Sequence, residues 1–411
     1  MSNDRARINR RKFLQSSALG AAAAASGTVA APRLLRAQGA GVKLGVLHPV
    51  SGALSYSGQQ GRLGATIAID EINAAGGIKA LGGAKIDPVL GDAQSTPEGG
   101  NAEVEKMNAA GVAAIVGGYA SSICLAASQT AARYELPYLV DVGVADDITK
   151  RGLKNTFRFG PGFGVIAKTA IDNLITINDQ AGKPAKTVII VHEDSLFGSG
   201  LAKLLNAQLP GKGFEILETI PHPTPMRDFA NVVLKIKAQN PDIVIPANYY
   251  NEYVLLARTM QEQHVRPKGI YSVLGGAASS YKFVKDFPDA AKYIMDCNHW
   301  FNPKSAKAQE LRKKVEEKGQ FFTYELYLNY SAVLLVADAL ERAASSDRAK
   351  IITALESSTF ASPIMPYGPT KFVNGQNQGA APLNTQVLDN DIKSILPPEF
   401  AIAKAVFPMP A

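Results

Sequence analysis

The sequence is poor in the residues that build metal sites and disulfide frameworks. Only two cysteines, Cys124 and Cys297, occur in 411 residues, and they lack the spacing of a zinc site or a redox pair. We expect two free, buried thiols, with a disulfide between them as the alternative. The 5 histidines are scattered, without the H-x-x-x-H or H-x-x-E-H spacing of a metal site. We therefore expect neither a metal nor a cofactor.

Motifs for catalysis and for phosphate binding are also missing. In FGSG (197–200), Phe197 takes the place of the first glycine of a G-x-S-x-G nucleophile elbow, and no G-K-[ST] phosphate loop occurs. The glycines in FRFGPGFG (157–164) lack the spacing of a dinucleotide fingerprint and suit a hinge or crossover instead. A binding protein is favoured over an enzyme, although dispersed catalytic residues would leave no motif.

The first forty residues are typical of an export signal. NRRKFLQ (9–15) places paired arginines before an alanine-rich run at 18–31, and small residues follow near 37–39. This order predicts a twin-arginine signal peptide over residues 1–39 and a periplasmic protein. The alternative, a membrane anchor, is disfavoured because the apolar run is shorter than the roughly 20 residues that a span needs.

Net charge gives little reason to expect nucleic acid as a partner. Residues 1–39 carry 7 Lys and Arg and one acid, Asp4, so this segment holds +6 of the formal net charge of +7. The remaining chain is close to neutral and offers no basic patch. It is also about 370 residues long, more than one core comfortably supports, so two domains are expected.

From Val42 onwards, short apolar strands alternate with helical stretches. This order predicts βαβ units with parallel sheets, and the pattern restarts after residue 164, so two α/β halves follow one another. Strands are expected at 42–52, where the strand runs into a turn, and at 112–118, 186–194 and 241–248, and helices at 60–73, 122–134, 229–239 and 252–263. Farther along, the charged run 305–319 predicts an exposed helix and the apolar run 326–343 a buried one.

GGYASSICL (117–125) joins one of these strands to an alanine-rich helix. Its glycines allow a sharp turn, and Ser121 or Ser122 would cap the helix. A helix start of this kind suits a carboxylate or a phosphate, because its free N–H groups and its dipole both point at the anion. Serine caps also open many helices that bind nothing, so a purely structural role is the alternative.

Seven stretches resemble the leucine/isoleucine/valine-binding type of periplasmic solute-binding protein, which serves ABC importers. They are HPVSGALSYSGQQGRLGATIAIDEINAAGGI, GDAQSTPEGG, IVGGYASS, LPYLVDVGVADDITKRG, VHEDSLFGSGLAK, DFANVVLKIKAQNPDIVI and YGPTKF. The resemblance implies an α/β fold with two Rossmann-like lobes of parallel strands, joined by three crossover strands. A small solute is then held in the cleft between the lobes, which close by a hinge motion.

The same resemblance implies where the lobes begin and end. Lobe 1 is expected over residues 40–158 plus about 301–370, and lobe 2 over about 159–300 plus 371–411. The crossovers would then lie near 157–161, 299–303 and 367–372. The expected partner is an ABC permease in the inner membrane, and we expect a monomer.

At the implied ligand site, Ser121 and neighbouring backbone N–H groups would hold a carboxylate, with Ser122 as a second donor. In amino-acid-binding members a threonine and a glutamate meet the ligand's ammonium group. Those positions fall here on Val144, beside Gly143, and on Gly275, and neither side chain can serve a cation. Burying an ammonium group without partners would cost several kcal/mol. Asp141 or Glu325 could replace the missing partner.

Aromatic residues complete the implied site. Phe197 and Tyr249 fall on ligand-facing aromatic positions, while Tyr56 and Tyr119 flank two loops of lobe 1. These side chains could equally be core or rim residues. Together they suggest a carboxylate ligand with an apolar or aromatic body and no amino group, although an amino acid is the family's usual ligand. The other functions considered are an exported ligand-sensing module for a membrane receptor and an exported α/β enzyme.

Overall fold

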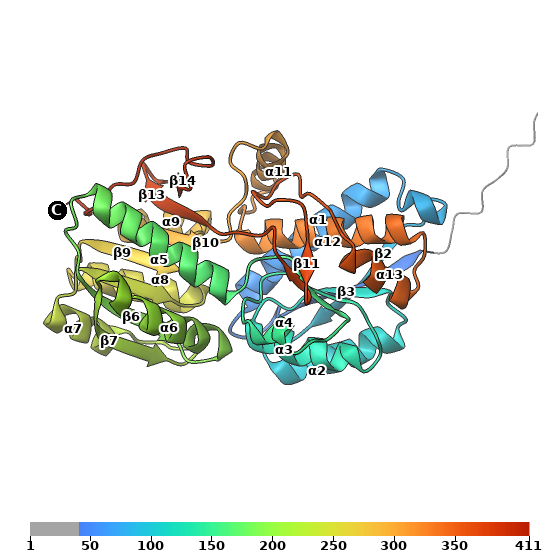
Figure 1. Cartoon of the computed structure of the whole chain (residues 1–411), viewed down its shortest axis with the longest axis horizontal. Coiled ribbons are helices and arrows are strands. Elements are labelled where there is room, and N and C mark those ends of the chain that lie inside the picture. Colours follow the sequence, from blue (N-terminus) through green and yellow to red (C-terminus); the bar gives the residue numbers. More distant parts are fainter. Residues whose placement is uncertain (1–40, 411) are drawn as a thin grey trace, which may run out of the picture. The chain divides into compact units, whose positions relative to one another are not determined.

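Two seven-stranded sheets organise residues 41–410, the part of the chain that the computed structural model describes (Figure 1). The export signal expected over residues 1–39 lies outside these residues. The strand order is β11-β12-β5-β4-β3-β1-β2 in the first sheet and β14-β13-β10-β9-β8-β6-β7 in the second. The first sheet contains β1 (Val42–His48), β2 (Ile86–Asp92), β3 (Ala114–Gly117), β4 (Tyr138–Val140), β5 (Thr156–Arg158), β11 (Phe372–Val373) and β12 (Gln376–Asn377).

The second sheet repeats the arrangement of the first. It contains β6 (Thr187–Glu193), β7 (Glu215–His222), β8 (Ile243–Ala247), β9 (Gly269–Val273), β10 (Met295–Asn298), β13 (Leu383–Leu388) and β14 (Asp391–Leu396). Strands β1–β5 pair in parallel, as do β6–β10, whereas β11, β13 and β14 pair antiparallel at the edges. The predicted succession of two α/β halves is confirmed, with sheets that are mixed rather than wholly parallel.

Helices cover both faces of the central strands, because these strands are apolar on both faces. In β6, for example, Val188, Ile189, Ile190 and Val191 are all fully buried, as expected of a parallel strand between two helical layers. The helices are α1 (Ser55–Ala74), α2 (Pro97–Ala109), α3 (Ser121–Ala132), α4 (Asp147–Lys150), α5 (Phe163–Gln180), α6 (Leu196–Gln208), α7 (Ala230–Gln239), α8 (Tyr250–Glu262), α9 (Tyr281–Asp286), α10 (Pro288–Ala291), α11 (Ala306–Glu317), α12 (Tyr324–Ala343) and α13 (Arg348–Glu356), with short 3-10 turns η1 (Lys79–Leu81) and η2 (Pro210–Lys212).

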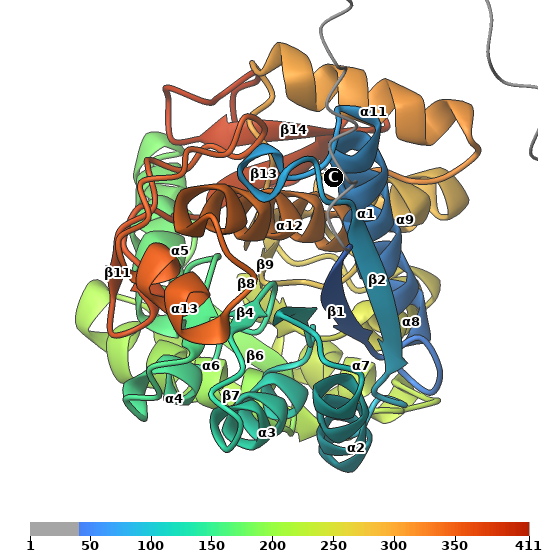
Figure 2. The same cartoon turned by 90° about the vertical axis from the view of Figure 1, so that its right-hand side faces the viewer.

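The apolar helix α12 is buried, as its sequence predicts, and lies side by side with α1 (Figures 1 and 2). The two helices approach closely at a glycine, since a Cβ atom on Gly64 would stand 1.9 Å from the Leu326 carbonyl oxygen. The predicted charged helix is α11, whose lysines form surface ion pairs with Glu71 and Glu310. No helix among residues 41–410 is long and apolar enough to cross a membrane.

The chain changes sheets three times. It leaves the first sheet after β5, comes back after β10, and enters the second sheet again with β13. The sequence placed the third crossing near 367–372, and this is wrong. Phe372 pairs with Asn377, and Gln376 pairs with Arg158, so residues 372–377 still belong to the first sheet.

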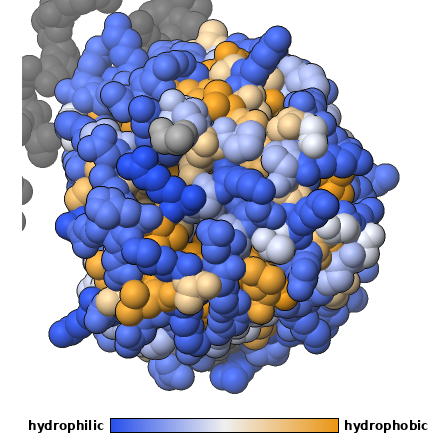
Figure 3. Space-filling model, turned by 90° about the vertical axis from the view of Figure 1, so that its left-hand side faces the viewer, coloured by the Kyte–Doolittle hydropathy of each residue, from blue (hydrophilic) through white to orange (hydrophobic). Residues whose placement is uncertain are grey.

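Apolar side chains lie mainly inside. The face drawn in Figure 3 is mostly hydrophilic and shows hydrophobic residues only in separate small patches. Cys124 and Cys297 are both free and buried, which confirms the expectation of two unpaired thiols. The interior therefore does not depend on a disulfide.

Candidate functional site

A small cavity lies among the loops that follow strands of both sheets. Its empty volume is about 350 Å³, counting the part that opens to solvent. In parallel α/β sheets, the carboxyl ends of the strands are where ligands usually bind. The lining residues are Tyr119, Ala120, Ser121, Val142, Val144, Phe197, Asn248, Tyr249, Leu274, Asn298, His299 and Tyr324. They include no acidic side chain, no lysine and no arginine.

The structure brings five of the predicted site residues together at this cavity. They are Tyr119, Ser121, Val144, Phe197 and Tyr249. The rings of Tyr119 and Phe197 both approach Tyr249, with centroid distances of 5.9 Å and 5.2 Å. Because Tyr249 and Phe197 belong to the second half and Tyr119 to the first, aromatic rings from both halves form the wall.

The other four predicted residues do not line the cavity. Gly143 is packed against Cys124, since a Cβ atom there would stand 2.7 Å from Sγ. Tyr56 packs on Tyr250 instead, with ring centroids 4.4 Å apart. Gly275 donates its N–H to Asp296 Oδ1 at 3.0 Å, and Ser122 lies beside Ser121 without reaching the lining.

Ser121 does not cap its helix, and this corrects the sequence prediction. The N-cap of α3 is Ala120, with no side-chain cap. Ser121 Oγ instead accepts the backbone N–H groups of Val144 at 3.2 Å and Ala145 at 3.1 Å. These two bonds occupy the acceptor sites of the hydroxyl, so its hydrogen remains available for donation.

The first turn of α3 offers further donors beside that hydroxyl. The first N–H groups of a helix have no partner within it, and no side chain in the described part of the chain, residues 41–410, caps them here. Tyr119 and Ala120, which precede this turn, line the cavity together with Ser121. The start of α3, with its hydrogen-bond donors and the positive end of its helix dipole, is thus part of the cavity lining.

Unusual backbone conformations shape the cavity on both sides. Tyr119 and Leu274, which line it, have φ angles of 57° each, in the left-handed region that costs a residue other than glycine about 1 kcal/mol or more. Both turns are tied to a buried carboxylate. Asp141 Oδ1 accepts the N–H of Tyr119 at 3.0 Å, and Asp296 accepts that of Gly275 in the same way. In each sheet, a buried carboxylate thus holds the turn that contributes a side chain to the cavity.

Neither carboxylate proposed as a substitute ammonium partner lines the cavity. Asp141 is fully buried, and its Oδ2 accepts from Asn329 Nδ2 at 2.8 Å and lies 3.4 Å from His48 Nε2. Burial alone would raise the pKa of Asp141, but the hydrogen bonds from His48 and Asn329 outweigh it and lower the pKa. Glu325 is also buried, and burial raises its pKa to about 7. Asp141 is thus engaged in structural contacts, and Glu325 stands outside the lining.

Sequence reasoning missed the polar residues Asn248, Asn298, His299 and Tyr324. Asn248 follows β8 directly, and His299 follows β10. A polar residue at the carboxyl end of an apolar strand is the signal that could have identified them. Burial lowers the pKa of His299 to about 3, so its imidazole is neutral at physiological pH.

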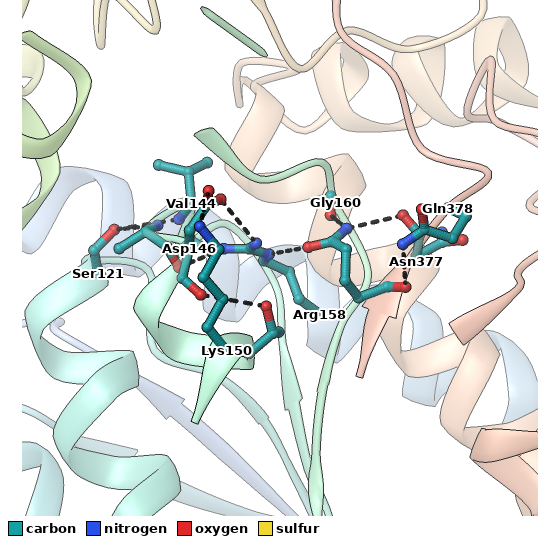
Figure 4. A network of polar contacts seen from close by, with 12 residues as sticks. Ser121, Val144, Asp146, Lys150, Arg158, Gly160, Asn377 and Gln378 are labelled. Atoms are coloured by element: carbon teal, nitrogen blue, oxygen red, sulfur yellow. Dashed lines mark hydrogen bonds and ion pairs between the residues drawn. The ribbon is translucent and has the colours of Figure 1, made fainter. Parts of the chain in front are cut away.

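A network of polar contacts joins the loop that holds Ser121 to the crossover segments (Figure 4). Its centre is Arg158, which is only 2% exposed and donates to the Ala145 carbonyl and to Gln376 Oε1, both at 2.6 Å. Gln376 in turn donates to the Gly160 carbonyl at 3.0 Å. One buried guanidinium therefore links the loop at 143–146 to two of the three places where the chain changes sheets.

Residues 41–391 match the family model for periplasmic binding proteins. The chain belongs to this family. A curated relative of this periplasmic binding protein is Leu/Ile/Val-binding protein homolog 8 of Brucella abortus (strain 2308), 28% identical over 381 residues that cover 90% of this chain and 93% of the relative. The family expected from the sequence is confirmed.

Solved structures agree on the fold of this periplasmic binding protein. One is the branched-chain amino acid transporter substrate-binding protein LivJ of Streptococcus pneumoniae in complex with isoleucine, with a TM-score of 0.72, 22% identity and coverage of 87% of this chain and 100% of that one. Another is a solute-binding protein of an ABC transporter from R. palustris in complex with benzoate, with a TM-score of 0.75, 18% identity and coverage of 89% and 97%. These relatives are binding proteins rather than enzymes.

Proposed function

We propose that this chain is the solute-binding subunit of an ABC importer and captures a small carboxylate that has an apolar or aromatic body and no amino group. The observation that carries the proposal is the composition of the cavity. The lining combines Ser121 and the start of α3, which offer hydrogen-bond donors, with aromatic and aliphatic side chains, and none of the lining residues among 41–410 is acidic. This arrangement supports binding of an anion and gives a cation no partner.

The carboxylate would be held at the start of α3. The hydroxyl of Ser121 is free to donate, and among residues 41–410 no side chain caps the N–H groups at the start of the helix. Such charge-assisted hydrogen bonds stabilise an anion without a buried counter-charge. Ser121 itself is held by two backbone N–H groups of the neighbouring loop, so its hydroxyl is oriented before the ligand arrives.

An α-ammonium group would find no equivalent support. The side chain of Val144 is apolar and its N–H is engaged with Ser121, while Asp141 and Glu325 stand outside the lining. Isoleucine and benzoate, the ligands of two structural relatives, both carry a carboxylate, but only isoleucine carries an ammonium group. The cavity therefore favours an acid of the benzoate kind.

Capture by hinge closure is part of the same proposal. The chain crosses between the sheets three times, and Arg158 links two of the crossing segments to the Ser121 loop. A ligand held by residues of both halves would favour the closed arrangement, which a membrane permease would recognise. Export by the twin-arginine route, a periplasmic location and a monomeric state complete the proposal.

A thermal-shift screen of the chain from residue 40 onwards tests this function. The probes are benzoate and the matched pairs 3-phenylpropanoate with phenylalanine and 4-methylpentanoate with leucine. A ligand that binds only the folded protein raises its melting temperature, so a rise with the acids that lack an amino group is expected. A rise with the amino acids alone would contradict the proposed ligand class.

A further inference from the structure

The orientation of the Asn248 amide is set by its neighbour His222. His222 Nδ1 lies 2.9 Å from the Pro223 carbonyl oxygen, which can only accept, so Nδ1 carries the hydrogen. Burial lowers the pKa of His222, so the ring is neutral and its Nε2 is an acceptor. Asn248 Nδ2 contacts this Nε2 and therefore acts as the donor. The reverse orientation of the amide would bring its oxygen against the lone pair of Nε2.

This orientation leaves Asn248 Oδ1 as a fixed acceptor at the cavity. Asn248 is fully buried and lines the cavity, and its Oδ1 has no hydrogen-bond partner among residues 41–410. A buried carbonyl oxygen without a partner destabilises the free protein, and a ligand that donates to it removes that penalty. His299 Nε2, on the same lining, is unpartnered as well and belongs to a neutral ring.

We propose that Asn248 Oδ1 accepts a hydrogen bond from a hydroxyl group on the ligand, so that this site selects hydroxylated carboxylic acids over unsubstituted ones. The inference rests on the proposed function and narrows its ligand class. Ser121 follows β3 of the first sheet and Asn248 follows β8 of the second, so the two polar ends of the ligand are held from opposite sheets. Such a ligand would join the two halves by hydrogen bonds as well as by aromatic contact.

The lining favours a hydroxyl over an ammonium group as this donor. A hydroxyl is uncharged and needs only one acceptor, which Asn248 Oδ1 supplies. An ammonium group brings three donors and a full charge, and no carboxylate lines the cavity to balance it. His299 lies on the same lining. When its Nε2 carries the ring hydrogen, this nitrogen can donate a hydrogen bond to the oxygen of the ligand's hydroxyl group.

Calorimetric titration of the unaltered chain from residue 40 onwards with two matched series tests the proposal. The first series is benzoate, 4-hydroxybenzoate and 4-methoxybenzoate, and the second is 3-phenylpropanoate with its 4-hydroxy and 4-methoxy forms. In the series whose length fits, the hydroxy acid should bind at least about tenfold more tightly than both other members, because only it can donate. The methoxy acid separates donation from mere size.

A substitution then locates the preference on one atom. In Asn248→Leu the side chain keeps its approximate size but loses the acceptor, so the affinity ratio of hydroxy to unsubstituted acid should fall towards one. Asn248→Ala tests the same ratio if the leucine variant unfolds, and the melting temperature without ligand reports folding. Asn206→Leu, on α6 and outside the lining, serves as the matched control and should keep the ratio.

The outcomes separate this inference from the proposed function. If carboxylates bind but hydroxy and unsubstituted acids bind equally, selection by Asn248 is overturned while the proposed function stands. Tighter binding of tyrosine than of 3-(4-hydroxyphenyl)propanoate would contradict the proposed ligand class instead, because the two differ only by the ammonium group beside the carboxylate. If no carboxylate binds, the proposed function itself fails.

Discussion

At the scale of single residues, the proposed ligand contacts depend on which polar atoms already have hydrogen-bond partners within the protein. Ser121 illustrates this, since its serine identity predicts a helix cap but its oxygen accepts from a loop 23 and 24 residues farther along the chain. A cap is a local interaction and can be read from neighbouring letters, whereas this contact forms only when two strands lie side by side. Ser121 thus lines the cavity, but the helix cap that the sequence predicted there does not form, and its role as an anion site stays a prediction.

Replacing Ser121 by alanine removes a donor to the proposed carboxylate. We expect affinity for the tightest-binding acid to fall by about 1.5–3 kcal/mol, the typical value of a hydrogen bond to a charged group. Titration calorimetry measures this loss. Ser122→Ala is the control, because Ser122 lies next in sequence but outside the lining. Equal affinities for Ser121→Ala and the unaltered chain would move the anion elsewhere.

Glu325 should make stability depend on pH. Burial raises its folded-state pKa to about 7, above the unfolded value near 4.5, so the folded chain retains a proton that the unfolded chain loses. The free energy of unfolding therefore falls as pH rises from about 4.5 to 7, by up to roughly 3 kcal/mol.

Urea unfolding of Glu325→Gln and of the unaltered chain at pH 5 and pH 8 checks this. The variant should lose stability less steeply across this range, while Asp296, whose pKa burial raises to about 6, contributes in the same direction to both proteins. Parallel pH dependences in the two proteins would show that Glu325 titrates normally.

At the scale of elements, strands and helices with strong apolar patterns were predicted well. The strands from 42 and 186 and the buried helix α12 are long apolar runs whose burial decides their structure. Strands β11 and β12 were missed because each has only two residues and Gln376–Asn377 is polar. Their pairing depends on Arg158, which lies more than two hundred residues earlier.

Arg158 should hold the Ser121 loop and the crossovers in place. Arg158→Met would keep a long side chain but leave the Ala145 carbonyl and Gln376 without their donor, so we expect a loss of unfolding free energy on the order of 3 kcal/mol and weaker ligand binding. Chemical unfolding and titration measure the two effects. Lys150→Ala, an exposed position in the same network, should change stability little. An unchanged free energy of unfolding in Arg158→Met would show that the network does not contribute to stability.

The contact between α1 and α12 gives a second test at this scale. In Gly64→Ala the added methyl group would collide with the Leu326 carbonyl. We therefore expect the free energy of unfolding to fall by about 1–3 kcal/mol. Gly211→Ala, where a Cβ atom meets nothing within 4 Å, should be close to neutral. Equal melting temperatures for the two variants would mean that the helices separate at little cost.

At the scale of the whole molecule, the resemblance to a known family predicted the two-sheet fold, while the details of the site required tertiary structure. Asn248, Asn298 and His299 belong to no sequence motif. They line one cavity because the ends of strands from two sheets meet there. Gly275 was predicted from its place in a family alignment and Gly143 from its place beside Val144, and both lie outside the lining. Sequence position alone does not distinguish these two roles.

The most direct test of the central claim is a crystal structure of the chain from residue 40 onwards with the tightest-binding acid from the titrations. We expect the carboxylate to lie in the cavity, within hydrogen-bonding distance of Ser121 Oγ and of a first-turn N–H group of α3. A carboxylate bound away from Ser121, or an ammonium-bearing ligand held by Asp141 or Glu325, would contradict it.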